Sequence, residues 1–134
     1  MRSSLATAAA ALIVAMLLAA GCGGGGSEFP AGKWTGKVFG ANVGLFEFRS
    51  DGRWTFYMGD SLETVEEQAS GTYSATKDVL TFESDTSCKT VNVAAEHGTY
   101  TWAHHGDQLT LRVRKDTCGN RYATIDGVVL SPVN

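Results

Sequence analysis

The sequence predicts an all-β protein, an eight-stranded antiparallel up-and-down barrel, and three observations lead to this fold class. From Glu28 onward, apolar and polar residues alternate with period two, and no segment shows a sustained helical stripe. Glycine and aspartate clusters interrupt the alternation, and the two prolines lie near the ends of this region, at Pro30 and Pro132. An open sheet of eight short strands would leave two exposed edges, which closure removes. A two-sheet β-sandwich is the alternative that alternation alone does not exclude.

The first three strands are expected at residues 33–39, 43–49 and 53–58, where the alternation is clearest. The turn at residues 50–52 contains a glycine, which readily adopts the positive φ that hairpin turns need. Large apolar side chains occupy the positions expected to point into the barrel: Trp34, Val38, Phe46, Phe48, Trp54, Phe56 and Met58.

The other five strands are expected around residues 71–73, 80–82, 100–102, 108–114 and 121–130. Residues 63–68 are either the polar start of the first of these strands or a single helical turn, because alternation gives no answer there. The last strand is expected to begin at about Arg121, to include Ala123 and Ile125, and to end or bend at residues 126–127. Inward positions on the preceding strands are Tyr73, Leu80, Phe82, Tyr100 and Trp102.

One pattern occurs twice in this half of the chain: a Gly-Thr-Tyr strand, a turn, a strand that contains Leu-Thr, and then an aspartate and a cysteine. The first copy covers residues 71–88 and the second covers residues 98–118. Each copy predicts a hairpin that ends in a thiol, Cys88 or Cys118. We interpret the repeat as a way of building half of the barrel, with its tyrosines on the inner wall.

The N-terminal segment has the features of an export signal. Arg2 gives a positive start, and residues 8–20 form an apolar run that is too short to span a membrane. The run ends in Ala-Ala-Gly-Cys at residues 19–22, which resembles the lipobox of bacterial lipoprotein signal peptides. The resemblance implies cleavage before Cys22, acylation of this cysteine by palmitate-type chains, and anchoring on the extracytoplasmic (or periplasm-facing) side of a bacterial cell membrane. An ordinary signal peptide is the alternative.

A run of four glycines and a serine follows Cys22, and such a run behaves as a flexible coil. We therefore expect three parts: a lipoprotein signal peptide at residues 1–21, the lipidated cysteine with a glycine-rich tether at residues 22–31, and one barrel domain at residues 32–134. The membrane is then a partner through the lipid anchor, and the barrel itself need not touch lipid.

With Cys22 acylated, only Cys88 and Cys118 remain, and an even pair in an exported protein predicts a disulfide. This disulfide would close a loop of about thirty residues and stabilise the fold by roughly 3–4 kcal/mol on the chain-entropy model. A thiolate metal site is the alternative, but neither cysteine has a second cysteine or a well-spaced histidine beside it.

The charge balance excludes one class of partner. The chain carries 11 basic and 14 acidic side chains, for a formal net charge of −3. It has no basic stripe that would neutralise phosphates, so a nucleic-acid partner is not expected.

Two motifs resemble those of a known family. Gly-Lys-Trp at residues 32–34 is similar to the glycine-x-tryptophan signature of lipocalins and their calycin relatives. Asp-Thr-Cys-Gly-Asn-Arg at residues 116–121 is similar to the element before the final strand in bacterial lipocalin-like lipoprotein domains. The resemblance covers residues 32–130 and implies a small lipocalin-like barrel. It also implies that Trp34 closes one end of the barrel beneath Arg121, in a cation–π contact.

The inward-facing rings allow two kinds of interior. One is an apolar cup for a small hydrophobic or aromatic ligand, and the other is a core that the rings fill completely. A filled barrel would suit a structural or inhibitory module that recognises a protein, with residues 63–68 as a contact. The candidate ligand-binding residues are Trp34, Phe46, Trp54, Phe56, Tyr73, Tyr100, Trp102 and Arg121.

Catalytic and metal chemistry are not expected. His104 and His105 are adjacent near a predicted hairpin tip, and adjacent side chains of an extended chain point to opposite faces, so they do not readily share one metal ion. No activated nucleophile, phosphate loop or zinc-helix motif is present. Asp116 is expected to pair with Arg121 and to hold the loop at the disulfide. The sequence therefore predicts a non-enzymatic binding protein without a cofactor.

Overall fold

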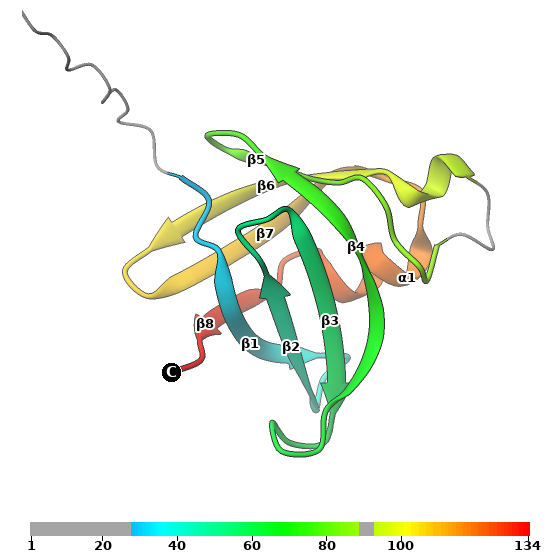
Figure 1. The fold of residues 1–134 in the computed structure, drawn as a ribbon. Helices are drawn as coiled ribbons and strands as arrows, with labels where there is room; N and C mark the ends of the chain where they lie inside the picture. Colours follow the sequence, from blue (N-terminus) through cyan, green and yellow to red (C-terminus); the bar gives the residue numbers. More distant parts are fainter. Residues whose placement is uncertain (1–27, 89–92) are drawn as a thin grey trace, which may run out of the picture.

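The computed structural model describes residues 28–88 and 93–134. Cys22 and the predicted signal peptide lie outside the described residues, as does most of the predicted tether. Eight antiparallel strands form a closed barrel in sequence order (Figure 1), so the predicted fold class is confirmed. The strands are β1 (Gly32–Val38), β2 (Asn42–Phe48), β3 (Arg53–Gly59), β4 (Glu66–Ala75), β5 (Val79–Phe82), β6 (Gly98–His105), β7 (Gln108–Asp116) and β8 (Val129–Pro132).

Two short helices in the described part of the chain lie at the ends of strands. The 3₁₀-helix η2 (Val93–Glu96) precedes β6, and the helix α1 (Gly119–Ile125) connects β7 to β8. Residues 63–68, for which alternation gave no answer, divide between a turn and the first residues of β4.

The alternation of each strand places its apolar residues on the inner surface, as expected. In the register, Phe46 lies opposite both Trp34 and Phe56, and Phe48 lies opposite Trp54. Directly opposite residues share one face of a sheet, so these rings form continuous inner rows across β1, β2 and β3. The core residues with no exposed surface include Leu80, Phe82, Tyr100, Leu109, Leu111 and Leu130.

The end of the barrel at which the chain enters is closed by aromatic packing. The ring of Phe29 lies 5.0 Å from that of Phe48, 5.4 Å from Trp102 and 5.7 Å from Tyr73, measured between centroids. The Trp34 indole N–H donates to the carbonyl oxygen of Pro30 at 2.9 Å. Phe29 and Pro30, which fall within the predicted tether, are therefore part of the packed structure. We call this end of the barrel the closed end.

Strand β4 changes partner along its length, and Gly71 lies close to the change. The first part of β4 pairs with β3 and the part from Tyr73 onward pairs with β5. A Cβ atom at Gly71 would lie 1.8 Å from the carbonyl oxygen of Ser84, so only glycine fits this close approach of two backbones. A register shift occurs earlier, where Gln68 is the extra residue of a β-bulge opposite β3.

The prediction of a strand from Arg121 is wrong, because residues 119–125 form α1. Arg121 and Ile125 are both buried and lie four residues apart, which is the spacing of one helical face. Gly127 follows the helix with a φ of 78°, a conformation that commonly ends helices and that glycine adopts without strain. The chain returns to the barrel only at β8, where Leu130 is fully buried.

Candidate functional site

A cavity of about 380 Å³ lies inside the barrel at the end opposite Phe29. The β1–β2 turn, the end of β3 and the start of β4 contribute to its wall. This is the opposite end of β2 and β4 from Phe48 and Tyr73, which contact Phe29. One face of α1 forms the other side. We call this space the α1 cavity. Its lining residues are Phe39, Phe46, Trp54, Phe56, Met58, Gln68, Ala69, Asp85, Ser87, Asn120, Arg121, Thr124 and Ile125.

Arg121 forms part of the cavity lining and is itself almost fully buried, with 4% of its surface exposed. Its Nε donates to Asp116 Oδ2 at 2.7 Å, and one Nη donates to Asp116 Oδ1 at 2.8 Å. The other Nη donates to Asp85 Oδ2 at 3.1 Å. The carbonyl oxygens of Ala95 and Glu96 each accept a further bond at 2.9 Å. All five guanidinium N–H groups are thus used.

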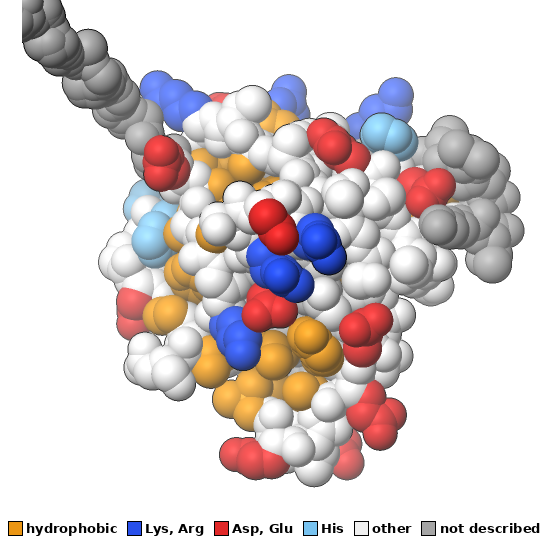
Figure 2. Space-filling view, in the orientation of Figure 1, with side chains coloured by type: hydrophobic (Ala, Val, Ile, Leu, Met, Phe, Trp, Pro, Cys, Tyr) orange, Lys and Arg blue, Asp and Glu red, His pale blue; other side chains and the backbone are white. Residues whose placement is uncertain are grey.

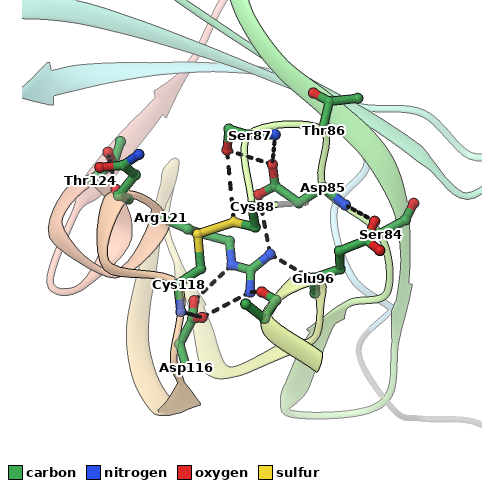
Figure 3. The surroundings of a disulfide bond; sticks show 12 residues. Ser84, Asp85, Thr86, Ser87, Cys88, Glu96, Asp116, Cys118, Arg121 and Thr124 are labelled. Carbon is green, nitrogen blue, oxygen red and sulfur yellow. Dashed lines mark hydrogen bonds and ion pairs between the residues drawn. A yellow bond between two sulfur atoms is a disulfide. The ribbon is translucent and has the colours of Figure 1, made fainter. Parts of the chain in front are cut away.

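Both copies of the sequence repeat meet at this arginine (Figure 3). Asp85 Oδ1 accepts the backbone N–H of Ser87 at 2.8 Å, and Asp116 Oδ1 accepts the backbone N–H of Cys118 at 2.9 Å. Each aspartate therefore caps its own turn two residues onward and also binds the same guanidinium. We call Arg121, Asp85 and Asp116 the Arg121 cluster.

A disulfide between Cys88 and Cys118 lies beside the Arg121 cluster, as predicted from the cysteine count. Both sulfur-bearing residues are buried and pack with Ala95 in a small second core. The disulfide and the ion pairs therefore tie together the same two loops, which follow β5 and β7. The predicted pairing of Asp116 with Arg121 is also confirmed.

Burial and hydrogen bonding shift two pKa values in this cluster. Burial, followed by the hydrogen bond that the Tyr100 hydroxyl donates to Asp116, raises the pKa of Tyr100 far above its usual value. Burial alone would lower the pKa of Arg121, but the bonds and charge of Asp116 together with the charge of Asp85 outweigh it and raise that pKa. Tyr100 therefore stays neutral and Arg121 stays charged in the folded protein.

The mouth of the α1 cavity carries an aromatic side chain in an unusual backbone conformation. Phe39 is the non-glycine residue with a positive φ in the described chain, at 47°, and 55% of its surface is exposed. Such a conformation costs a non-glycine residue roughly 1–2 kcal/mol. Because Phe39 lines the cavity and is also exposed, its ring lies at the entrance, where it contributes little to the core.

The structure brings half of the predicted ligand-binding residues together. Phe46, Trp54, Phe56 and Arg121 line the α1 cavity. The other four predicted residues serve the packed interior: Trp34, Tyr73 and Trp102 lie at the closed end, and Tyr100 is buried against Phe82 and Asp116. The interior of the barrel is therefore packed with rings at the closed end and contains the α1 cavity at the opposite end.

The predicted cation–π contact between Arg121 and Trp34 is wrong. The guanidinium carbon of Arg121 lies 5.4 Å from the ring centroid of Phe82 instead. Trp34 meets His104 edge to face, with 5.5 Å between ring centroids, at the closed end of the barrel. Because Arg121 belongs to α1, at the end of the barrel away from Trp34, the two side chains do not meet.

The sequence reasoning missed the contribution of α1 and of small or polar residues to the cavity. Asp85 and Ser87 were not among the predicted site residues, although both line the cavity and Asp85 is 1% exposed. A usable signal was present, because Asp85 and Asp116 occupy matching places in the two repeats. Matching acidic residues beside paired cysteines indicate a shared partner for both loops.

Within the described residues, no group of three or more histidine, cysteine, aspartate or glutamate side chains is placed to hold a metal ion. No helix in the described ranges has the length and apolar character needed to cross a membrane.

Comparison of the chain with protein-family models, curated proteins and solved structures found no match in any of the three. The closed eight-stranded antiparallel barrel is consistent with the lipocalin-like resemblance of the sequence.

Proposed function

We propose that this chain is an exported bacterial lipoprotein whose barrel binds a small hydrophobic or aromatic molecule without converting it chemically. The observation that carries the proposal is the α1 cavity, whose volume of about 380 Å³ falls within the range of small-molecule sites. Phe46, Trp54 and Phe56 supply an apolar wall, and Asp85 with Ser87 supplies a polar edge that would orient a ligand.

The lipoprotein part of the proposal rests on residues 19–22 and on the glycine-rich run that follows them. The described chain enters the barrel beside Phe29, at the closed end. A tether from an acylated Cys22 would therefore join the barrel at the closed end, away from the α1 cavity. The mouth near Phe39 would then face away from the point of attachment, where it can exchange ligand with the aqueous phase.

Binding is tested with the purified protein and the neutral fluorescent probe N-phenyl-1-naphthylamine. Ala69 lines the cavity opposite Phe56, so Ala69→Leu fills space that a ligand would occupy. We expect saturable binding by the natural sequence and binding at least about tenfold weaker by Ala69→Leu, a loss of about 1.4 kcal/mol. Ala123→Leu, on the exposed side of α1, is the matched control and keeps the natural affinity.

The smaller substitution Ala69→Val guards against overpacking and is expected to show an intermediate loss. Thermal melts show whether each variant is folded. The absence of saturable binding to the natural sequence, or equal binding by a folded Ala69→Leu variant, would contradict the proposal.

The anchor is tested separately by mass spectrometry of the membrane fraction of bacteria that express the full chain. We expect an N-terminal peptide that begins at acylated Cys22, and release of Cys22→Ser from the membrane. An unmodified Cys22 in the mature protein would contradict the lipoprotein assignment.

A further inference from the structure

We infer that the α1 cavity selects ligands that combine an apolar aromatic body with a positively charged amine. The inference rests on the proposed binding function and concerns the chemical class of the ligand. Three features of the cavity point to it: a carboxylate with acceptor capacity at its floor, the charge of its rim, and its aromatic wall.

The charges that line the floor of the cavity are one carboxylate, Asp85, and one guanidinium, Arg121, and the carboxylate is the one that retains hydrogen-bonding capacity. Arg121 pairs both with Asp85 and with Asp116, which lies behind the lining, so its positive charge is balanced within the protein. Asp85 Oδ1 accepts two hydrogen bonds from Ser87, whereas Oδ2 accepts one bond, from Arg121, among the described residues. A carboxylate oxygen has two acceptor positions, so Oδ2 retains capacity for a donor on a ligand.

Arg121 does not offer a binding site for an anion, even though it is the positively charged residue of the cavity lining. Its five N–H groups already donate to Asp85, Asp116 and two backbone carbonyl oxygens. A ligand carboxylate at this position would find no free guanidinium donor and would lie close to Asp85. A fatty-acid-like ligand is therefore disfavoured.

The rim near the start of β4 is also acidic. The register places Glu66 opposite Met58, which lines the cavity, so Glu66 is on the same face of the sheet as Met58 and, being exposed, lies beside the mouth rather than among the lining residues. Glu67 lies opposite Tyr57 on the outer face. Figure 2 shows acidic side chains around the β3–β4 hairpin at the lower tip of the molecule, and no lysine or arginine of the described residues appears at this tip in the view.

The wall between floor and rim suits a cation as well as an apolar group. Phe46 and Phe56 lie with their ring centroids 4.7 Å apart, and Trp54 lines the same cavity. The faces of aromatic rings attract cations, most strongly when the cation is partly removed from water. An arylalkyl ammonium group would thus meet acidic oxygens and ring faces in one space.

The test compares three ligands that share one ring system and differ in charge: 1-naphthylmethylamine, 1-naphthylmethanol and 1-naphthoate. Their affinities are measured by calorimetry with the purified protein at neutral pH. We expect the amine to bind about tenfold more tightly than the alcohol, with the carboxylate weakest, and this preference to shrink as salt concentration rises.

Glu66→Gln is expected to reduce the preference for the amine over the alcohol by about threefold, the effect of one partly solvated charge. Glu67→Gln is the matched control, because it removes an equal charge from the neighbouring position on the outer face, and it leaves the preference unchanged. Both side chains are exposed, so both variants are expected to fold.

Each result separates this inference from the proposed function. If the alcohol or the carboxylate binds as tightly as the amine, the inference is overturned while the binding function stands. An equal loss of preference in both glutamine variants would attribute the selectivity to the overall acidity of the protein and would also overturn the inference. If none of the three ligands binds while N-phenyl-1-naphthylamine does, the inference fails and the binding function stands; if N-phenyl-1-naphthylamine does not bind either, both fail.

Discussion

Removal of the charge at Arg121 should be the most damaging single substitution in the barrel. In Arg121→Met the apolar part of the side chain is roughly conserved, whereas all five hydrogen bonds of the guanidinium are lost. Asp85 and Asp116 are then left as buried carboxylates without their cationic partner. The disulfide stays intact, so the two loops remain joined covalently.

The expected loss of stability follows from the burial of the partners. The side chains of Arg121, Asp116 and Asp85 in these ion pairs are 2%, 0% and 1% exposed. Removing one partner from such a buried pair costs about 3–5 kcal/mol, because the remaining charge is not solvated. A domain of this size has a total stability of about 5–15 kcal/mol, so the variant should be severely destabilised or unfolded.

The measurement is urea denaturation followed by tryptophan fluorescence, with the free energy of unfolding compared between variants. Arg114→Met is the matched control, because Arg114 is exposed on β7, and we expect a change within about 0.5 kcal/mol. A loss below about 1 kcal/mol in Arg121→Met would show that the cluster contributes little net stability and would refute the reasoning.

Two further predictions concern the same region. Replacing Cys88 and Cys118 together by serine should lower the free energy of unfolding by about 3–4 kcal/mol through loss of the loop constraint. Urea denaturation measures this loss, and free thiols in the natural protein under non-reducing mass spectrometry would contradict the pairing. The pKa of Tyr100 is raised in the folded state, so above the ordinary tyrosine pKa of 10.0 the unfolded state loses this proton first. Stability should therefore fall by about 1.4 kcal/mol per pH unit above that point because of this residue. The slope should be shallower in Tyr100→Phe, and equal slopes in the two proteins would show that Tyr100 is not the group responsible.

The sequence was sufficient to predict the barrel because alternation of apolar and polar residues directly indicates a sheet with one buried face. Phe46 and Phe48, or Trp54 and Phe56, are two residues apart, and the strands place each pair on the inner surface. Short turns rich in glycine and aspartate join the first strands, so the first half of the domain has no room for long connections. These local signals agree with one another, and closure follows from the need to remove sheet edges.

Helix α1 was missed because it is short and its pattern supports two interpretations. Ala123 and Ile125 are two residues apart, as in a strand, whereas Arg121 and Ile125 are four apart, as in a helix. A helix interpretation requires Arg121 to be buried, which sequence alone makes improbable for a charged residue. The partners that make its burial favourable lie far away in the chain, at Asp85 and in the backbone of η2.

The cavity could not be predicted because the inward direction of a side chain does not determine how completely the interior is filled. The list of inward rings includes residues at both ends of the barrel. Phe29, outside that list, fills the closed end, whereas Ala69 and the bulge at Gln68 leave space at the other. A void depends on the small residues between the large ones and on the distance between strands, and neither is visible in the alternation.

The short pairing of β8 has a consequence for how the barrel opens. β8 pairs with β7 at Leu130 and Val129, and with β1 at Pro132 and Ser131, where proline contributes no N–H. Every other strand is held over a longer run on at least one side. Amide hydrogen exchange should therefore detect local opening at β8 before the remaining strands separate. The barrel is closed in the structure, but we expect β8 to separate from β7 and β1 while the other seven strands stay paired.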